Sequence, residues 1–268
     1  DIVIESIDSQ PISALMWLVL CGKCDFVIEF LHCKEQQWLK FSQQWLEQLG
    51  VEVDLQHNKI RLVANQVCQS FQYNIPADYS TALYPALAAI LTQGKVELLG
   101  LIKQDFQPDK IAFNYLQNWG ANIDWQDDVL VVSAGIEFSG GELDISLCID
   151  ALPALVVAAT FAKQPSVFLN CLAAELKESR RVTAMIDIIR SMGGQISFTN
   201  GSLTINPGLL QRSNIIKSLS DHRLALSGLI LALAMDKPIT IDGVDCVAKT
   251  YPGLVKVWQK CNVEIIEL

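Results

Sequence analysis

The stretch Ser220-Asp221-His222-Arg223, followed by the small and apolar residues 224–234, decides the fold of this 268-residue chain. Aspartate is among the best residues for the position before a helix, because its carboxylate accepts hydrogen bonds from free backbone N–H groups. The alanine, leucine, serine and glycine residues that follow predict a helix that is buried on most sides. An aspartate that precedes a similar helix occurs three more times, at Asp8, Asp78 and Asp150.

The four aspartates are separated by 70, 72 and 71 residues, which predicts an internal repeat. A glycine keeps the same phase, at Gly50, Gly120 and Gly193, where we expect a left-handed backbone just past a helix end. A fourth copy of this segment, around Cys261, has no glycine. Short polar turns follow the glycines and predict hairpins. The repeat therefore predicts an α/β (α+β) fold of four βαβαββ units.

Composition limits the function. The formal net charge of −9 opposes a nucleic-acid-binding role, which needs a broad basic face, but it permits a cleft for small anions. The apolar stretches are shorter than the roughly 20 residues that a membrane span needs. Eight cysteines indicate a reducing, cytoplasmic setting. Half of a zinc site is conceivable at Cys21, Cys24, His32 and Cys33, but no second CxxC follows, so we expect no metal.

The densest polar cluster is Glu175-Leu-Lys177-Glu178-Ser179-Arg180-Arg181, which we expect to begin the second helix of the third unit. A solvated first turn is one interpretation. Cations at a helix start oppose the helix dipole, however, and an anionic ligand would relieve that conflict.

The fourth unit offers a similar set of side chains: His222 and Arg223 on its first helix, and Lys249 before its second. Because repeated units share one plan, we expect these helix starts to converge on a common anion site. The aspartates have two interpretations. Capping is favoured for Asp8 and Asp78, whereas capping and a functional role are both open for the aspartates at 150 and 221.

Several motifs together resemble the EPSP synthase (3-phosphoshikimate 1-carboxyvinyltransferase) family. Lys177-Glu-Ser-Arg-Arg181, the Asp221-His-Arg motif and Ala248-Lys-Thr-Tyr-Pro252 are similar to its KETDR, DHR and AKTFP motifs. Residues 9–15 and 78–82 are similar to its SSQFxxALL and DxSSA segments, and Asp150 falls where its catalytic aspartate does. The resemblance covers the whole chain in order. The related UDP-N-acetylglucosamine enolpyruvyl transferase shares the fold but not the KETDR-like run.

The resemblance implies transfer of the enolpyruvyl group of phosphoenolpyruvate to the 5-hydroxyl of shikimate 3-phosphate, without metal or organic cofactor. Arg181, Arg223, Lys249 and His222 would hold phosphoenolpyruvate. Ser9, Gln10, Asp150 and Lys177 would bind shikimate 3-phosphate. Asp150 would take the hydroxyl proton, and Glu178 with Lys249 would handle the proton at the methylene carbon.

The family's fold is an inside-out α/β barrel with six βαβαββ units in two domains, of which this chain has four. We expect residues 1–68 to be the last unit of an incomplete N-terminal domain and residues 69–268 to be a three-unit C-terminal domain. The chain would then be a fragment that is inactive alone, and a monomer when full length.

The sequence departs from the family pattern at Arg180, which reverses a charge, and on the acceptor side. The acceptor-side departures are Asp8, Glu35, Trp38 and Ala173. A carboxylate beside a bound phosphate is repulsive. The alternative function is therefore a relative with an altered acceptor, or a non-catalytic binding or structural module.

Overall fold

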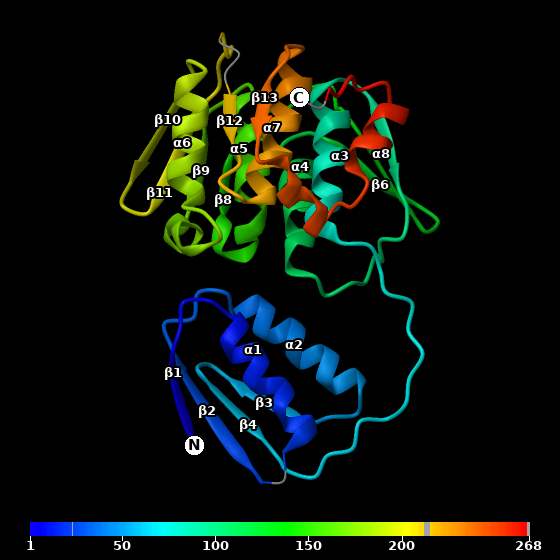
Figure 1. Cartoon of the computed structure of the whole chain (residues 1–268), viewed down its shortest axis with the longest axis vertical. Coiled ribbons are helices and arrows are strands. Elements are labelled where there is room, and N and C mark those ends of the chain that lie inside the picture. Colours follow the sequence, from blue (N-terminus) through cyan, green and yellow to red (C-terminus); the bar gives the residue numbers. More distant parts are fainter. Residues whose placement is uncertain (23, 212–214, 267–268) are drawn as a thin grey trace.

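The computed structural model describes residues 1–22, 24–211 and 215–266, which form two bodies, each with its own hydrophobic core (Figure 1). The core of the smaller body is made by residues between 12 and 62, and that of the larger by residues between 79 and 258. The connection between the last strand of the first body and the first helix of the second runs from 63 to 78 without helix or strand.

The smaller body is the first repeat unit. Its elements are β1 (Ile2–Glu5), α1 (Gln10–Trp17), η1 (Leu18–Cys21), β2 (Phe26–Leu31), α2 (Gln36–Gln48), β3 (Val53–Gln56) and β4 (Lys59–Leu62). The sheet order is β1-β2-β4-β3, with β1 parallel to β2 and the other pairs antiparallel. Both α-helices cover one face of this sheet (Figure 1). Their apolar residues, including Ile12, Met16, Leu39 and Leu46, fill the space between the two layers.

The third unit repeats this plan. It contains β8 (Glu142–Asp144), η3 (Ile145–Leu147), η4 (Ile149–Ala151), α5 (Leu152–Thr160), β9 (Ser166–Leu169), η5 (Cys171–Leu176), α6 (Arg181–Ser191), β10 (Gln195–Thr199) and β11 (Ser202–Asn206). Its sheet order, β8-β9-β11-β10, has the same parallel and antiparallel pairs as the first unit. The predicted βαβαββ repeat is thus confirmed in these two units.

The second and fourth units are partial. The second has α3 (Tyr79–Leu91), β5 (Lys95–Leu98), η2 (Pro108–Lys110), α4 (Ile111–Asn118), β6 (Asn122–Gln126) and β7 (Val129–Ser133), in a β5-β7-β6 sheet. The fourth has β12 (Ile215–Lys217), α7 (His222–Met235), β13 (Thr240–Asp242), η6 (Val244–Lys249) and α8 (Leu254–Lys260). Within the described ranges the second unit lacks the leading strand and the fourth lacks the hairpin. In the described part of the chain, the βαβαββ plan is therefore complete in two units and partial in the other two.

Three helices form the centre of the larger body: α3, α5 and α7, which contact one another pairwise. All nine residues of α5, Leu-Pro-Ala-Leu-Val-Val-Ala-Ala-Thr, are buried. A helix that is apolar on every side is stable in water only when other elements surround it. The elements that pack around α5 are α3, α6, α7 and strand β11. The first helix of each of these units therefore lies inside, and its starting residues are brought together.

The predicted helix ends are confirmed at three glycines, whose φ angles are 78° at Gly50, 107° at Gly120 and 89° at Gly193. In the fourth unit the left-handed residue is Asn262, with φ 62°, and not Cys261, the position that the repeat predicts. After glycine, asparagine is the residue that most often adopts the left-handed conformation at a helix end. Two-residue turns join β3 to β4, β6 to β7 and β10 to β11, as the hairpin prediction requires.

Candidate functional site

Asp150 is the centre of the candidate site. It lies in η4, immediately before α5, and its Oδ1 is 2.5 Å from Nη1 of Arg181 and 3.7 Å from Nζ of Lys177. Burial would raise the pKa of Asp150, but Arg223, Lys177 and Arg181 together lower that pKa to about 2. Asp150 is therefore an ionised carboxylate that three cations from the third and fourth units approach, as the repeat predicts.

Arg181 is the most enclosed of these cations, with 1% of its side chain exposed. Its guanidinium contacts three carboxylates: Asp150, Glu178 through Nη2 at 2.7 Å, and Asp221 through Nε at 2.8 Å. The expectation that Glu175 begins a helix is wrong, because η5 ends at Leu176 and α6 begins at Arg181. Residues 177–180 form a loop between η5 and α6, in which Lys177 and Ser179 contact distant residues. Carboxylates of the chain itself neutralise Arg181.

Asp221, for which the sequence left capping and a functional role open, both caps a helix and forms an ion pair. Its Oδ1 accepts a hydrogen bond from the backbone N–H of Arg223 at 2.9 Å and so caps α7. Its Oδ2 accepts from Oγ of Ser179 at 2.8 Å as well as from Arg181. Burial opposes ionisation, yet these donors lower the pKa of Asp221. The carboxylate of Asp221 therefore connects the third unit to the fourth.

The other aspartates differ from one another. Asp78 caps α3 by accepting from the backbone N–H groups of Ser80 and Thr81. Asp8 accepts from the N–H of Gln10, although Ser9 holds the N-cap position of α1. Asp150 makes no cap, since the residue before α5 is Ala151. Equal spacing in sequence therefore does not give equal roles.

Arg223 and His222 form the first turn of α7 and are buried, with 7% and 6% exposure. Nε of Arg223 and Nδ1 of His222 have no hydrogen-bond partner in the described part of the chain. Burial and the charge of Arg223 lower the pKa of His222, so this imidazole is neutral at pH 7. A buried guanidinium with an unused donor is the feature that most directly indicates a missing anionic partner.

Ser9 and Lys177, the residues predicted to bind the acceptor, both contact Glu35. Oε2 of Glu35 accepts hydrogen bonds from the backbone N–H of Ser9 at 3.1 Å and from its Oγ at 2.9 Å. Oε1 of Glu35 forms an ion pair with Nζ of Lys177, whose pKa is raised by Asp150 and Glu35 against the effect of burial. This pair joins the two bodies, and it is the one ion pair that does so among the described residues.

Two predicted residues are not brought into this network. Lys249 is exposed at the end of η6 and forms no ion pair with any described residue. Gln10 is exposed at the start of α1. Glu178 contacts the centre through Arg181 and leaves 44% of its side chain open to solvent.

Sequence reasoning missed Asp109, which is 1% exposed and accepts a hydrogen bond from Oγ of Ser80. Its Oδ1 has no partner in the described chain. Burial, followed by the charge of Asp150, raises the pKa of Asp109 to about 7, although Arg223 and Ser80 oppose that rise. The only signal in the sequence was a proline at 108, which marks a helix start.

The departures from the family pattern have different consequences. Arg180 has 75% of its side chain exposed and pairs with Glu175, away from the centre. Trp38 packs edge-on against Phe41 at 5.7 Å, and Ala173 is buried in η5. Two departures place a carboxylate directly on predicted site residues: Glu35, described above, and Asp8, which accepts from the backbone N–H of Gln10.

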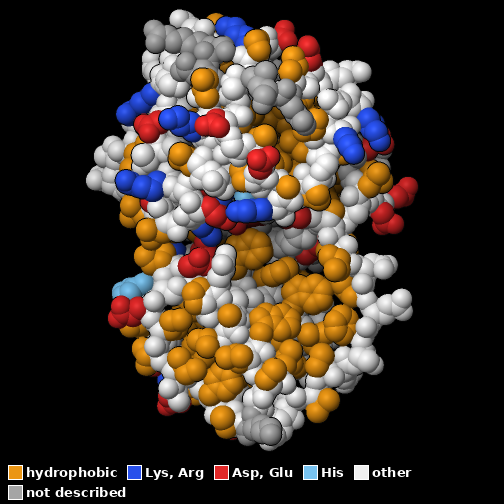
Figure 2. All heavy atoms as spheres, viewed as in Figure 1, with side chains coloured by type: hydrophobic (Ala, Val, Ile, Leu, Met, Phe, Trp, Pro, Cys, Tyr) orange, Lys and Arg blue, Asp and Glu red, His pale blue; other side chains and the backbone are white. Residues whose placement is uncertain are grey.

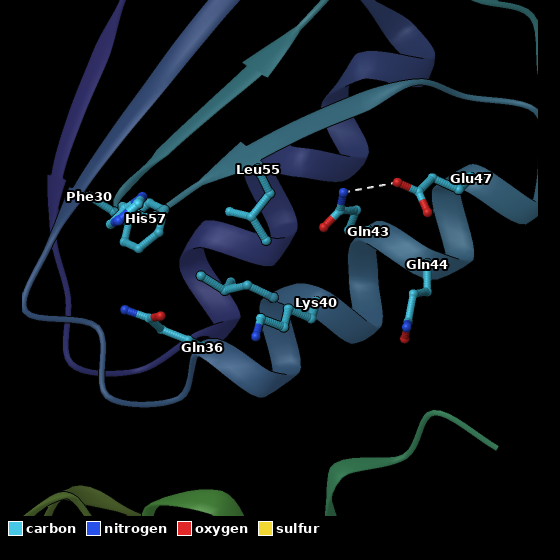
Figure 3. A pocket seen from close by; sticks show the side chains of 9 residues that line it. Phe30, Gln36, Lys40, Gln43, Gln44, Glu47, Leu55 and His57 are labelled. Carbon is cyan, nitrogen blue, oxygen red and sulfur yellow. Dashed lines mark hydrogen bonds between the residues drawn. The ribbon is translucent and has the colours of Figure 1, made fainter. Parts of the chain in front are cut away.

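A surface hollow lies away from these residues. It measures about 430 Å³ and is formed on the first unit by α2 and neighbouring strands, with Gln36, Lys40, Gln43 and His57 around it (Figure 3). No predicted site residue lines this hollow. A smaller hollow of about 260 Å³ borders Glu178 at the start of α6.

The described residues meet the requirements of neither a metal site nor a membrane-spanning helix. The described residues contain no group of three or more histidine, cysteine and acidic side chains placed to hold a metal ion, so the zinc interpretation gains no support. All eight cysteines are free. Among the described helices, none combines the length and apolar character that crossing a membrane requires.

Repeated βαβαββ units, with cations and carboxylates gathered where buried central helices begin, define an α/β repeat protein with a charged centre between its units. The model of the family described as EPSP synthase (3-phosphoshikimate 1-carboxyvinyltransferase) matches residues 6–258. The chain belongs to this family, as its motifs indicate.

Relatives and solved structures agree with this assignment. The chain is 36% identical over 270 residues to the 3-phosphoshikimate 1-carboxyvinyltransferase of Chlamydia pneumoniae, a match that covers 98% of this chain and 59% of the relative. It is 33% identical to that of Chlamydia caviae, covering 97% and 58%. The fold resembles the 2.37 Å structure of EPSP synthase from Acinetobacter baumannii, with a TM-score of 0.74, 21% identity, and coverage of 97% and 62%. The chain thus spans less than two thirds of the length of these proteins.

Proposed function

We propose that this chain is the larger part of an enzyme that transfers the enolpyruvyl group of phosphoenolpyruvate to the 5-hydroxyl of shikimate 3-phosphate. The observation that carries the proposal is that Lys177 and Arg181 pair with Asp150 while the nearby charge of Arg223 lowers the pKa of that carboxylate, and that the buried Nε of Arg223 has no partner among the described residues. Both substrates are multiply charged anions, so a site for them needs several enclosed donors.

In the proposed reaction the hydroxyl oxygen bonds to C2 of phosphoenolpyruvate while C3 gains a proton. Asp150 takes the hydroxyl proton, and Glu178, with Lys249, supplies the proton at C3. The C2–O bond to phosphate then breaks, phosphate leaves with the bonding electrons, and C3 returns its proton to restore the double bond. Asp150, ionised by its cations, is a weak base until substrate anions share those cations.

Phosphoenolpyruvate would be held by Arg181, Arg223, His222 and Lys249, and shikimate 3-phosphate by Ser9, Gln10, Asp150 and Lys177. In the described chain, Arg181 has three carboxylate partners and Lys177 has two. These carboxylates leave little net positive charge for a substrate. Additional cations from outside this chain would complete the site.

We further propose the domain arrangement expected from the sequence: residues 1–68 as one unit of an N-terminal domain and 69–268 as the C-terminal domain. The visible face of the first body, where α1 and α2 lie, shows many hydrophobic side chains (Figure 2). Trp17, Leu18, Phe71 and Tyr73 are among the exposed large apolar residues of this part of the chain. Further units of the same kind would cover them, in a cytoplasmic protein that is a monomer when full length.

The proposal is tested by Arg223→Ala and Lys249→Ala in the full-length protein. Each variant should raise KM for phosphoenolpyruvate or lower kcat by at least roughly tenfold while the fold persists. Wild-type kinetics in both variants would exclude the assigned phosphoenolpyruvate site. Calorimetry of the 268-residue chain with phosphoenolpyruvate should show weak binding or none.

A second candidate is a relative that uses a different acceptor. Glu35 favours it, because its carboxylate lies on the donors of Ser9 and Lys177 that a phosphorylated acceptor would use. Turnover with shikimate 3-phosphate decides between the two candidates.

A further inference from the structure

Glu35 occupies an unusual position for a residue that begins a helix. It holds the N-cap position of α2, yet its side chain makes no capping hydrogen bond there. The carboxylate reaches instead to the start of α1, where it accepts from the N–H and Oγ of Ser9. Glutamate is not among the preferred N-cap residues, so its carboxylate is available for donors elsewhere.

Three donors bind the carboxylate of Glu35, and together they suit an anion. One is a backbone N–H, one is a hydroxyl, and the third is the ammonium group of Lys177, whose side chain is 11% exposed. Glu35 itself has 3% of its side chain exposed. An anion held by a charged donor and two further hydrogen bonds, away from water, is bound strongly.

We propose that Glu35 is a specificity-determining residue: a built-in anion that competes with the phosphate of an acceptor for Ser9 and Lys177. The carboxylate and an incoming phosphate cannot share these donors, because two anions repel strongly at contact distance where water is excluded. A phosphorylated acceptor must therefore displace Glu35 and break the ion pair that joins the two bodies. An acceptor without a phosphate at this position meets no such competition.

The inference rests on the proposed function only in placing an acceptor beside Ser9, and its test needs no turnover. Inorganic phosphate is the probe, measured by titration calorimetry on the 268-residue chain. Glu35→Ser removes the carboxylate and leaves the donors of Ser9 and Lys177 free. Glu35→Gln keeps the size of the side chain and removes only its charge.

Glu35→Ser should bind phosphate at least about tenfold more tightly than the wild type, with Glu35→Gln in between. The double variant Glu35→Ser/Ser9→Ala should lose most of this gain. Asp144→Ser is the matched control, since Asp144 is a carboxylate that accepts hydrogen bonds from Ser146 and Asn170 and should leave phosphate binding unchanged.

Equal phosphate affinity in the wild type and Glu35→Ser would overturn the inference. So would unfolding of both position-35 variants in circular dichroism, because Glu35 would then be a structural ion-pair partner. Tighter phosphate binding without turnover of shikimate 3-phosphate by the full-length protein would support the role of Glu35 and count against the proposed function.

Discussion

The Nε of Arg181 donates to Oδ2 of Asp221 over 2.8 Å, and both side chains are closed off from solvent. Arg181 begins the second helix of the third unit, and Asp221 caps the first helix of the fourth. The pair therefore connects two copies of the repeat at the candidate site, so that fold stability and site geometry depend on the same contact.

Replacing Asp221 with alanine should destabilise the chain by about 3–5 kcal/mol, because the change leaves Arg181 buried with a missing partner and removes a helix cap. Urea unfolding followed by circular dichroism measures this loss. Asp124→Asn, an exposed change on β6, is the control and should lie within about 0.5 kcal/mol of the wild type. A similar small effect for Asp221→Ala would show that the pair is not structural.

The two buried arginines should respond differently to substitution by methionine, which keeps much of the apolar volume. Arg181→Met leaves Asp150 and Asp221 without their shared cation and should cost about 3 kcal/mol or more. Arg223→Met should cost less than Arg181→Met, since Arg223 acts on Asp150 through its charge and its Nε has no hydrogen-bond partner among the described residues to lose. Urea unfolding of both variants compares them directly, and equal losses would contradict this distinction between structure and binding.

The raised pKa of Asp109 predicts that the free energy of unfolding depends on pH. Its folded pKa is raised to about 7, so the favourable contribution of its protonated form is fully present below the unfolded pKa near 4. That contribution is lost as the pH rises from about 4 through about 7, by up to a few kcal/mol in unfolding free energy. Asp109→Asn, which is neutral at every pH, should flatten this decline.

Urea unfolding of the wild type and Asp109→Asn at pH 5 and pH 8 measures the effect. The groups that act on the carboxyl of Asp109 are Asp150, Arg223, Ser80 and Asp78, so the change in slope reports on the centre of the site. Identical pH slopes for the two proteins would mean that Asp109 is ionised throughout this range.

The 70-residue repeat predicted much of the fold, because glycines and hairpin turns act locally on the backbone. The repeat did not predict the segments whose structure depends on contacts with distant residues. Residues 177–180 are a loop, because their side chains and Arg181 serve contacts with distant units. The burial of Asp109 depends on η2 packing against η4, which no local pattern shows. The left-handed backbone at Asn262 was not predicted, because the fourth copy has no glycine and was aligned at Cys261, one position earlier.

The glycines after the second helices offer a matched comparison. A Cβ on Gly120 would lie 1.9 Å from the carbonyl oxygen of Glu137, whereas a Cβ on Gly193 meets no described atom within 4 Å. Gly193→Ala should therefore cost only the strain of a left-handed alanine, about 1 kcal/mol. Gly120→Ala should cost clearly more, because the backbone of residue 137 must move. Thermal unfolding of both variants tests this order, and a larger loss at 193 would contradict it.

The most direct test of the central claim is the release of inorganic phosphate from phosphoenolpyruvate by the full-length protein, compared between the wild type and Asp150→Asn. The wild type should release phosphate only when shikimate 3-phosphate is present. Asp150→Asn, which keeps the shape of the side chain but cannot take the hydroxyl proton, should be slower by about a hundredfold or more. A wild-type rate in Asp150→Asn would contradict the account.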